Sequence, residues 1–133
     1  MNAAVTKFGP VVGRFLIALI FLLSGIGKVT GFAGTAGYMA SKGLPMIEVL
    51  LVASIVIELA GAAMLILGWK ASLGALALFL WMIPVTLIFH NFWAVPPEQY
   101  QIQQIMFMKN LAIMGALLYV MSFGSGSFSL DRK

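Results

Sequence analysis

Residues 46–68, MIEVLLVASIVIELAGAAMLILG, form an apolar stretch that is long enough to cross a lipid bilayer as one helix. A helix rises about 1.5 Å per residue and the hydrocarbon core is about 30 Å thick, so one crossing needs about 20 apolar residues. Glu58 lies well inside this stretch. A carboxylate at such depth is costly and normally faces a partner, a cavity or a proton path. The stretch therefore predicts a membrane helix in which the Glu58 carboxylate faces a partner, a cavity or a proton path.

Three further apolar stretches predict the other membrane crossings. They lie at residues 10–29, 71–89 and 102–123. We expect Pro10 to open the first of these helices and Pro84 to interrupt and bend the third crossing of the chain. Residues 30–45 are too polar to cross but leave room for a short helix on the membrane surface. Short connections make successive helices antiparallel neighbours, so the sequence predicts an all-α membrane protein whose single domain, 1–133, is a four-helix bundle.

The composition indicates a chain built for lipid. Hydrophobic residues make up 62% of the sequence and charged residues only 9%, against about 25% charged residues in soluble domains. The net charge is +4, but the basic residues are spread singly along the chain, which favours contact with membrane lipid and no binding of nucleic acid. The sequence has no cysteine and no dinucleotide-binding fingerprint. We therefore expect neither an intrinsic iron–sulfur cluster nor a bound nucleotide.

The distribution of basic residues predicts the orientation of the bundle. The side that holds both termini carries Lys7, Arg14, Lys70, Arg132 and Lys133, and the opposite side carries Lys28, Lys42 and Lys109. Cytoplasmic loops of membrane proteins carry the excess of Lys and Arg. We therefore expect a multi-pass protein of the bacterial inner membrane with both termini in the cytoplasm.

Glu58 has several candidate partners for its carboxylate. Counted along the helices, Arg14 differs from Glu58 by roughly 9 Å in depth and Lys109 by about 10 Å, whereas Lys28 is farther. Three interpretations follow. The Arg14–Glu58 pair fixes helix packing only, or Glu58 exchanges a proton with a ligand while Arg14 orients it, or a protonated Glu58 bonds a neighbour.

A second group of polar residues is expected at the other end of the bundle. His90, Asn91, Lys109 and Asn110 lie at the ends of adjacent helices, near Trp93 and Tyr100, and Lys28 can join them. Contact with lipid headgroups and helix capping would explain them, as would a site for a polar-headed, membrane-soluble ligand. His90 is the only histidine, so the chain lacks the two axial imidazoles of a b-type haem. We expect no metal site.

The order of these motifs resembles the DoxX family of small bacterial membrane proteins. The matching stretches are Arg14, Phe21-Leu-Leu-Ser-Gly-Ile-Gly-Lys28, Gly37-Tyr38, Gly43-Leu-Pro45, Glu58-Leu-Ala-Gly61, Phe89-His-Asn-Phe-Trp93, Met108-Lys-Asn110 and Ser129-Leu-Asp131. The resemblance covers nearly the whole chain. One departure is the exit Gly124-Ser-Gly-Ser127, where many members have Gly-Pro-Gly.

The resemblance implies four membrane helices and a link to quinone chemistry. The family takes its name from a subunit of a terminal quinol oxidase and is similar to the membrane subunit of thiosulfate:quinone oxidoreductase. The family's polar positions correspond to Arg14, Lys28, Glu58, His90, Lys109 and Asn110. In this hypothesis the chain is the membrane subunit of a quinone-linked oxidoreductase, with quinone as its cofactor and a redox protein as its partner. Glu58 and His90 would handle protons, and the other polar residues would orient the ligand.

Two other functions are compatible with the same sequence. A non-catalytic scaffold would use the small residues of its helices for lateral contacts with other membrane proteins. A transporter of protons or small solutes would use the charged groups at several depths, and with only four helices it would need a homo-oligomer. Crosslinking within the membrane would test the first function, and flux in proteoliposomes would test the second.

Overall fold

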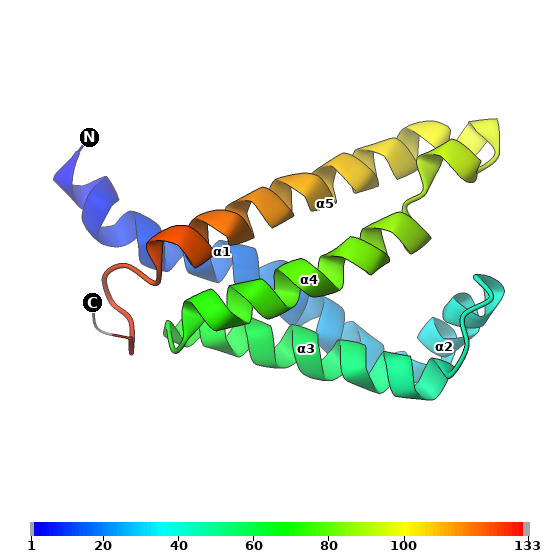
Figure 1. Ribbon diagram of the computed structural model, residues 1–133, viewed down its shortest axis with the longest axis horizontal. Helices are drawn as coiled ribbons and strands as arrows, with labels where there is room; N and C mark the ends of the chain where they lie inside the picture. Colours follow the sequence, from blue (N-terminus) through cyan, green and yellow to red (C-terminus); the bar gives the residue numbers. More distant parts are fainter. Residues whose placement is uncertain (1, 132–133) are drawn as a thin grey trace.

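The chain folds into helices that run back and forth along one axis (Figure 1). The computed structural model describes residues 2–131, which contain no strand. The helices are α1 (Ala3–Thr30), α2 (Phe32–Ser41), α3 (Ile47–Leu67), α4 (Ala71–Phe89), the 3-10 helix η1 (Phe92–Ala94) and α5 (Pro97–Phe123). Both termini lie at the same end of the bundle, called here the terminal end, and α2 and η1 lie at the opposite, loop end.

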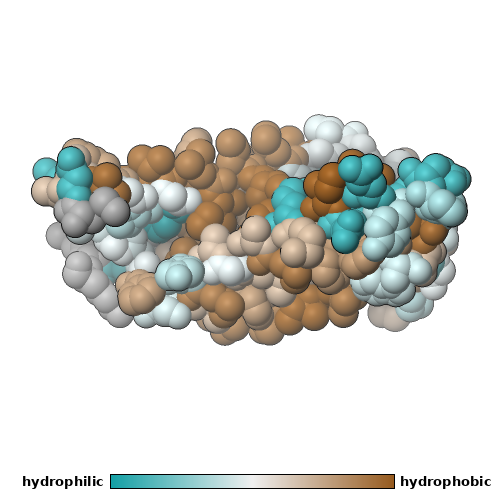
Figure 2. All heavy atoms as spheres, turned by 90° about the horizontal axis from the view of Figure 1, so that it is seen from above, coloured by the Kyte–Doolittle hydropathy of each residue, from teal (hydrophilic) through white to brown (hydrophobic). Residues whose placement is uncertain are grey.

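Four of these helices are long and apolar enough to cross a membrane: α1, α3, α4 together with η1, and α5. Hydrophobic residues cover the middle of the molecule, and hydrophilic residues lie mainly toward its two ends (Figure 2). The predicted all-α fold with four spans is therefore confirmed, and so is the short helix between the first and second spans.

Two helices begin earlier than the approximate spans predicted for them. Helix α1 begins at Ala3, because the side chain of Asn2 accepts a hydrogen bond of 2.7 Å from the backbone N–H of Ala4 and alanine is the strongest helix former. Pro10 consequently lies inside the helix instead of opening it. Helix α5 begins at Pro97 rather than at residue 102, since proline fits the first turn of a helix.

Helix α4 also continues through its proline. Pro84 lies inside α4, which the structure keeps as a single helix to Phe89. The predicted interruption is therefore wrong, because a proline removes one backbone donor without requiring the helix to end. Thr86, two residues later, is buried and accepts a hydrogen bond from Asn110 of α5.

Each membrane-length helix packs mainly on the next one in the sequence. Helix α1 packs on α3, α3 on α4, and α4 on α5, whereas α1 and α5 contact each other only slightly. Small residues allow the close pairs: a Cβ atom on Gly61 of α3 would lie 2.6 Å from Cγ of Leu78, which is fully buried in α4. The predicted small-residue contact between the second and third spans is therefore present.

Candidate functional site

Glu58 forms an ion pair with Lys28 inside the bundle. Lys28 of α1 contacts the carboxylate of Glu58, which is only 3% exposed on α3. Ser54, one turn before Glu58, donates a hydrogen bond of 2.9 Å to Oε1 of Glu58 and accepts one of 2.9 Å from Nζ of Lys28. The carboxylate therefore has both a counter-charge and a hydroxyl donor in the membrane interior, as a buried charge requires.

The expected pair of Arg14 with Glu58 is wrong. A side chain on a helix tilts toward that helix's N-terminus, and α1 and α3 are antiparallel. Arg14 therefore leans toward the terminal end, away from Glu58, whereas Lys28 and Glu58 lean toward each other. Depth counted from sequence position alone ignored this tilt and made Lys28 seem too far away.

Arg14 instead binds backbone carbonyls at the terminal end. Its guanidinium donates hydrogen bonds to the carbonyls of Leu65 (2.8 Å) and Ile66 (3.3 Å) at the end of α3, and to those of Ser127 (3.2 Å) and Phe128 (2.9 Å) in the C-terminal segment. Arg14 is 2% exposed. A cation at a helix C-terminus satisfies orphan carbonyls and complements the helix dipole. Arg14 of α1 thus connects the end of α3 to the C-terminal segment and does not reach the site around Glu58.

The residues around the Lys28–Glu58 pair form a polar cavity of about 200 Å³. Its polar lining consists of Ser24, Lys28, Glu58, His90, Lys109 and Asn110. The structure therefore brings His90, Lys109 and Asn110 together, as the sequence predicts, and it adds Glu58 to the same site. Residues of α1, α3, α4 and α5 line this cavity, together with His90 directly after α4.

Hydrogen bonds orient two of these polar residues. Nδ2 of Asn110 donates to Oγ1 of Thr86 over 3.1 Å, which ties α5 to α4. Nδ1 of His90 lies 2.9 Å from Oε1 of Gln103. This contact is a hydrogen bond to the amide oxygen in the tautomer that carries its hydrogen on Nδ1, and that tautomer leaves Nε2 as an acceptor.

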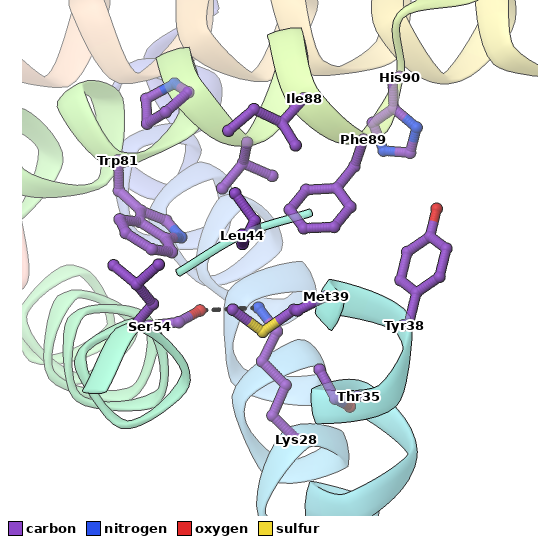
Figure 3. Close-up of a pocket in the computed structure, with 13 residues that line it drawn as sticks. Lys28, Thr35, Tyr38, Met39, Leu44, Ser54, Trp81, Ile88, Phe89 and His90 are labelled. Atoms are coloured by element: carbon purple, nitrogen blue, oxygen red, sulfur yellow. Dashed lines mark hydrogen bonds between the residues drawn. The ribbon is translucent and has the colours of Figure 1, made fainter. Parts of the chain in front are cut away.

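An apolar cavity of about 350 Å³ adjoins the polar one between α2, α3 and α4. The two cavities share Lys28, Trp81, Val85 and His90. Figure 3 shows Lys28 reaching from α1 to Ser54, with Met39 of α2 beside them. Trp81 and Phe89 of α4 lie on another side of the cavity, and His90, just after α4, lies farther out beyond Phe89 and near Tyr38. Together the cavities provide a space with a charged part and an apolar part.

Two residues predicted for the site lie outside both cavities. Trp93 packs edge-on against Phe92 and Phe107, with ring centroids 5.2 and 5.7 Å apart. Asn91 is half-buried, and its Oδ1 atom has no hydrogen-bond partner among residues 2–131. These residues belong to the loop end of the bundle, where an aromatic cluster connects η1 to α5.

Sequence reasoning missed three polar or aromatic residues that build the site: Ser54, Trp81 and Gln103. Ser54 lies four residues before Glu58, so helical spacing would have placed it on the same face. No comparable signal existed for Trp81 or Gln103, because their roles depend on which helices become neighbours. Within residues 2–131 no group of three or more His, Cys, Asp or Glu side chains is placed to hold a metal ion.

Comparisons with known proteins agree with this arrangement. The family model described as DoxX matches residues 9–91, which include Lys28, Glu58 and His90. The chain is 33% identical over 122 residues to inner membrane protein YphA of Escherichia coli (strain K12), which covers 92% of this chain and 87% of that protein. It is 34% identical over 124 residues to inner membrane protein YqjF of the same strain, with 93% and 90% covered.

A eukaryotic protein matches a shorter part of the chain. The Surfeit locus protein 4 homolog of Schizosaccharomyces pombe is 34% identical over 80 residues, 59% of this chain and 26% of that protein. No solved structure matches the chain. The family match over the first three spans, the two inner-membrane relatives over nearly the full length and the four membrane-length helices all agree, and this integral inner-membrane protein therefore belongs to the DoxX family.

Proposed function

We propose that this protein binds a quinone or quinol between its helices and acts as a membrane subunit of a redox assembly. The observation that carries the proposal is that a polar cavity and an apolar cavity lie side by side and share four lining residues, Lys28, Trp81, Val85 and His90. A quinone has a ring with two oxygen atoms and a long apolar tail. The ring suits the cavity of about 200 Å³ with its charged lining, and the tail suits the neighbouring apolar cavity.

The polar residues supply the proton chemistry that a quinol needs. Oxidation of a quinol releases two electrons and two protons. In the proposal, Nε2 of His90 accepts one proton, because Nδ1 already faces Gln103, and Glu58 accepts the other. Lys28 and Asn110 donate hydrogen bonds to the ring oxygens. The electrons pass to a partner protein, since a chain without cysteine cannot supply the ligands of its own iron–sulfur cluster.

Arg14 has no part in the proposed site. Its guanidinium binds carbonyls of α3 and of the C-terminal segment. In the proposal Lys28 therefore takes the role of orienting the ligand, which the sequence analysis gave to Arg14. A substitution of Arg14 is consequently expected to lower the free energy of unfolding and to leave the affinity for the ligand largely unchanged.

Glu58→Gln tests the proposal by the small molecules that copurify with the protein. We expect mass spectrometry of gently extracted wild type to show an enriched quinone, and Glu58→Gln to lose at least nine-tenths of it. Glu98→Gln is the matched control, because Glu98 is exposed in the first turn of α5 and the charge change is the same. Added ubiquinol should bind wild type and Glu98→Gln alike.

The same measurement can contradict the proposal. Lipid alone in all three samples, together with equally poor ubiquinol binding by wild type and Glu58→Gln, would show that the cavity holds no quinone. Quinone retained by Glu58→Gln at the wild-type level would show that Glu58 does not contribute to quinone binding.

A further inference from the structure

Lys109 lies near the middle of α5, a helix that is long and apolar enough to cross a membrane. It lies in the central part of α5, which has 27 residues and a length of about 40 Å at 1.5 Å per residue. If the helix is centred on a hydrocarbon core of about 30 Å, Lys109 is more than about 10 Å from either edge. A lysine stem of about 6 Å does not bridge that distance to water by snorkelling.

No carboxylate neutralises Lys109 within residues 2–131. The hydrogen-bond partner of its Nζ atom is the uncharged sulfur of Met106, at 3.6 Å. Glu58 lines the same polar cavity but is already paired with Lys28. Glu48 and Glu98 lie in the first turns of α3 and α5 at the loop end. The charges around the cavity therefore leave one positive charge in excess.

The position of Lys109 gives it access to both the cavity and the lipid. Helices α1 and α5 separate beside it, and a shallow groove lies between them. Apart from Lys109, the groove is lined by Leu16, Ile17, Ile20, Ala112, Ile113 and Ala116. Lys109 also lines the polar cavity with Lys28 and His90. An amphiphile that diffuses in the bilayer thus meets Lys109 where the groove joins the cavity.

We infer that the ligand of this site carries an acidic headgroup and binds as an anion, with its negative group on Lys109 and its apolar tail in the adjoining cavity. This inference rests on the proposed function and adds the class of ligand: an acidic amphiphile, such as a hydroxyquinone with an alkyl chain. Lys109 is exposed on the surface of α5, so in a membrane its surroundings are lipid and the cavity. A charge-assisted hydrogen bond to an anion stabilises a cation in such surroundings, and a neutral ligand of the same shape cannot provide the counter-charge. A long-chain carboxylic acid has the same chemistry, so the test distinguishes the two sources.

Binding of matched ligands to the full chain in nanodiscs of neutral lipid tests this inference. The probes are 2-hydroxy-3-undecyl-1,4-naphthoquinone, its 2-methoxy ether, ubiquinol and dodecanoate, at a pH where the hydroxyl and carboxyl groups are ionised. We expect wild type to bind the hydroxyquinone about tenfold or more tightly than the ether. Lys109→Met should bind both equally weakly, and Lys109→Arg should keep the preference and show that position 109 tolerates substitution.

Lys70→Met is the matched control for the loss of one positive charge. Lys70 is exposed at the terminal end and lies over the ring of Trp69, so this variant should keep the wild-type preference. Equal binding of hydroxyquinone and ether by wild type would overturn the inference while leaving quinone binding intact. Binding of dodecanoate alone, dependent on Lys109, would support the anionic site but overturn the quinone function. Binding of none of the four probes would overturn both.

Discussion

At the scale of single residues, the direction in which a side chain leaves its helix decides the charge pairs of this protein. Lys28 and Glu58 lie on antiparallel helices and tilt toward each other, so they pair despite their different depths. Arg14 tilts the other way and binds the carbonyl of Leu65. One consequence is that the buried carboxylate depends on Lys28 for its counter-charge.

Removing Lys28 alone should cost more stability than removing the whole pair. Lys28→Met leaves Glu58 buried at 3% exposure without its cation, and we expect the free energy of unfolding to fall by about 3 kcal/mol. The double variant Lys28→Met/Glu58→Gln removes both charges and should recover most of that loss. Denaturant unfolding in detergent micelles, followed by circular dichroism, measures both values. Equal losses in the single and double variants would show that the unpaired carboxylate of Glu58 is not the cause of the loss in Lys28→Met.

At the scale of elements, the C-terminal segment closes the terminal end of the bundle. Asp131 accepts hydrogen bonds from the backbone N–H groups of Lys70 (2.5 Å) and Ala71 (3.1 Å), and so caps the start of α4 from a distant part of the sequence. Arg14 caps the end of α3 and holds the same segment through Ser127 and Phe128. Two charged side chains thus connect α1, α3, α4 and the segment after α5.

Close packing of α3 against α4 makes Gly61 intolerant of a side chain. Because the added Cβ atom of Gly61→Ala would lie 2.6 Å from Cγ of the fully buried Leu78, we expect a loss of about 1–3 kcal/mol in the free energy of unfolding. Gly115→Ala is the matched control, since nothing lies within 4 Å of the added atom, and alanine favours a helix by about 0.5–1 kcal/mol over glycine. The two melting temperatures in detergent should therefore shift in opposite directions. A gain of similar size in both variants would mean that helix propensity, not the contact of α3 with α4, governs these positions.

At the scale of the whole molecule, both termini lie at one end of the bundle (Figure 1). This arrangement follows from an even number of spans, four, joined in sequence. The side of the membrane on which the termini lie stays a prediction from the basic residues, five against three, of which Arg132 and Lys133 lie outside the described residues. From that excess we expect the terminal end to face the cytoplasm.

Reporter fusions should locate the terminal end. Green fluorescent protein fused after residue 133 is expected to fluoresce, and alkaline phosphatase at the same place is expected to be inactive, because the first reporter folds in the cytoplasm and the second outside it. The same reporters inserted after Val95, between η1 and α5, should give the opposite result. Active phosphatase at the C-terminus would reverse the predicted orientation.

The local pattern of the sequence predicted the spans and part of the site. Apolar length alone identifies membrane helices, because every crossing must cover the same hydrocarbon thickness. Short connections make successive helices neighbours, which is why His90, Lys109 and Asn110 could be predicted to meet, and they line one cavity. Lys109 and Asn110, however, lie in the middle of α5 and not at its end, because α5 begins already at Pro97. Helix bounds near Pro10 and Pro97 were less predictable, since proline is compatible with both a helix start and a helix interior.

The sequence by itself thus determined the helical membrane fold, the shared end of the termini and the convergence of the polar residues. Only the tertiary structure decided that Glu58 pairs with Lys28, that Arg14 serves the C-terminal segment, and that an apolar cavity lies beside the polar one. The physical reason is that span length and connection length are local properties of the chain. Side-chain direction and the choice of neighbouring helices are set only when all the helices pack together.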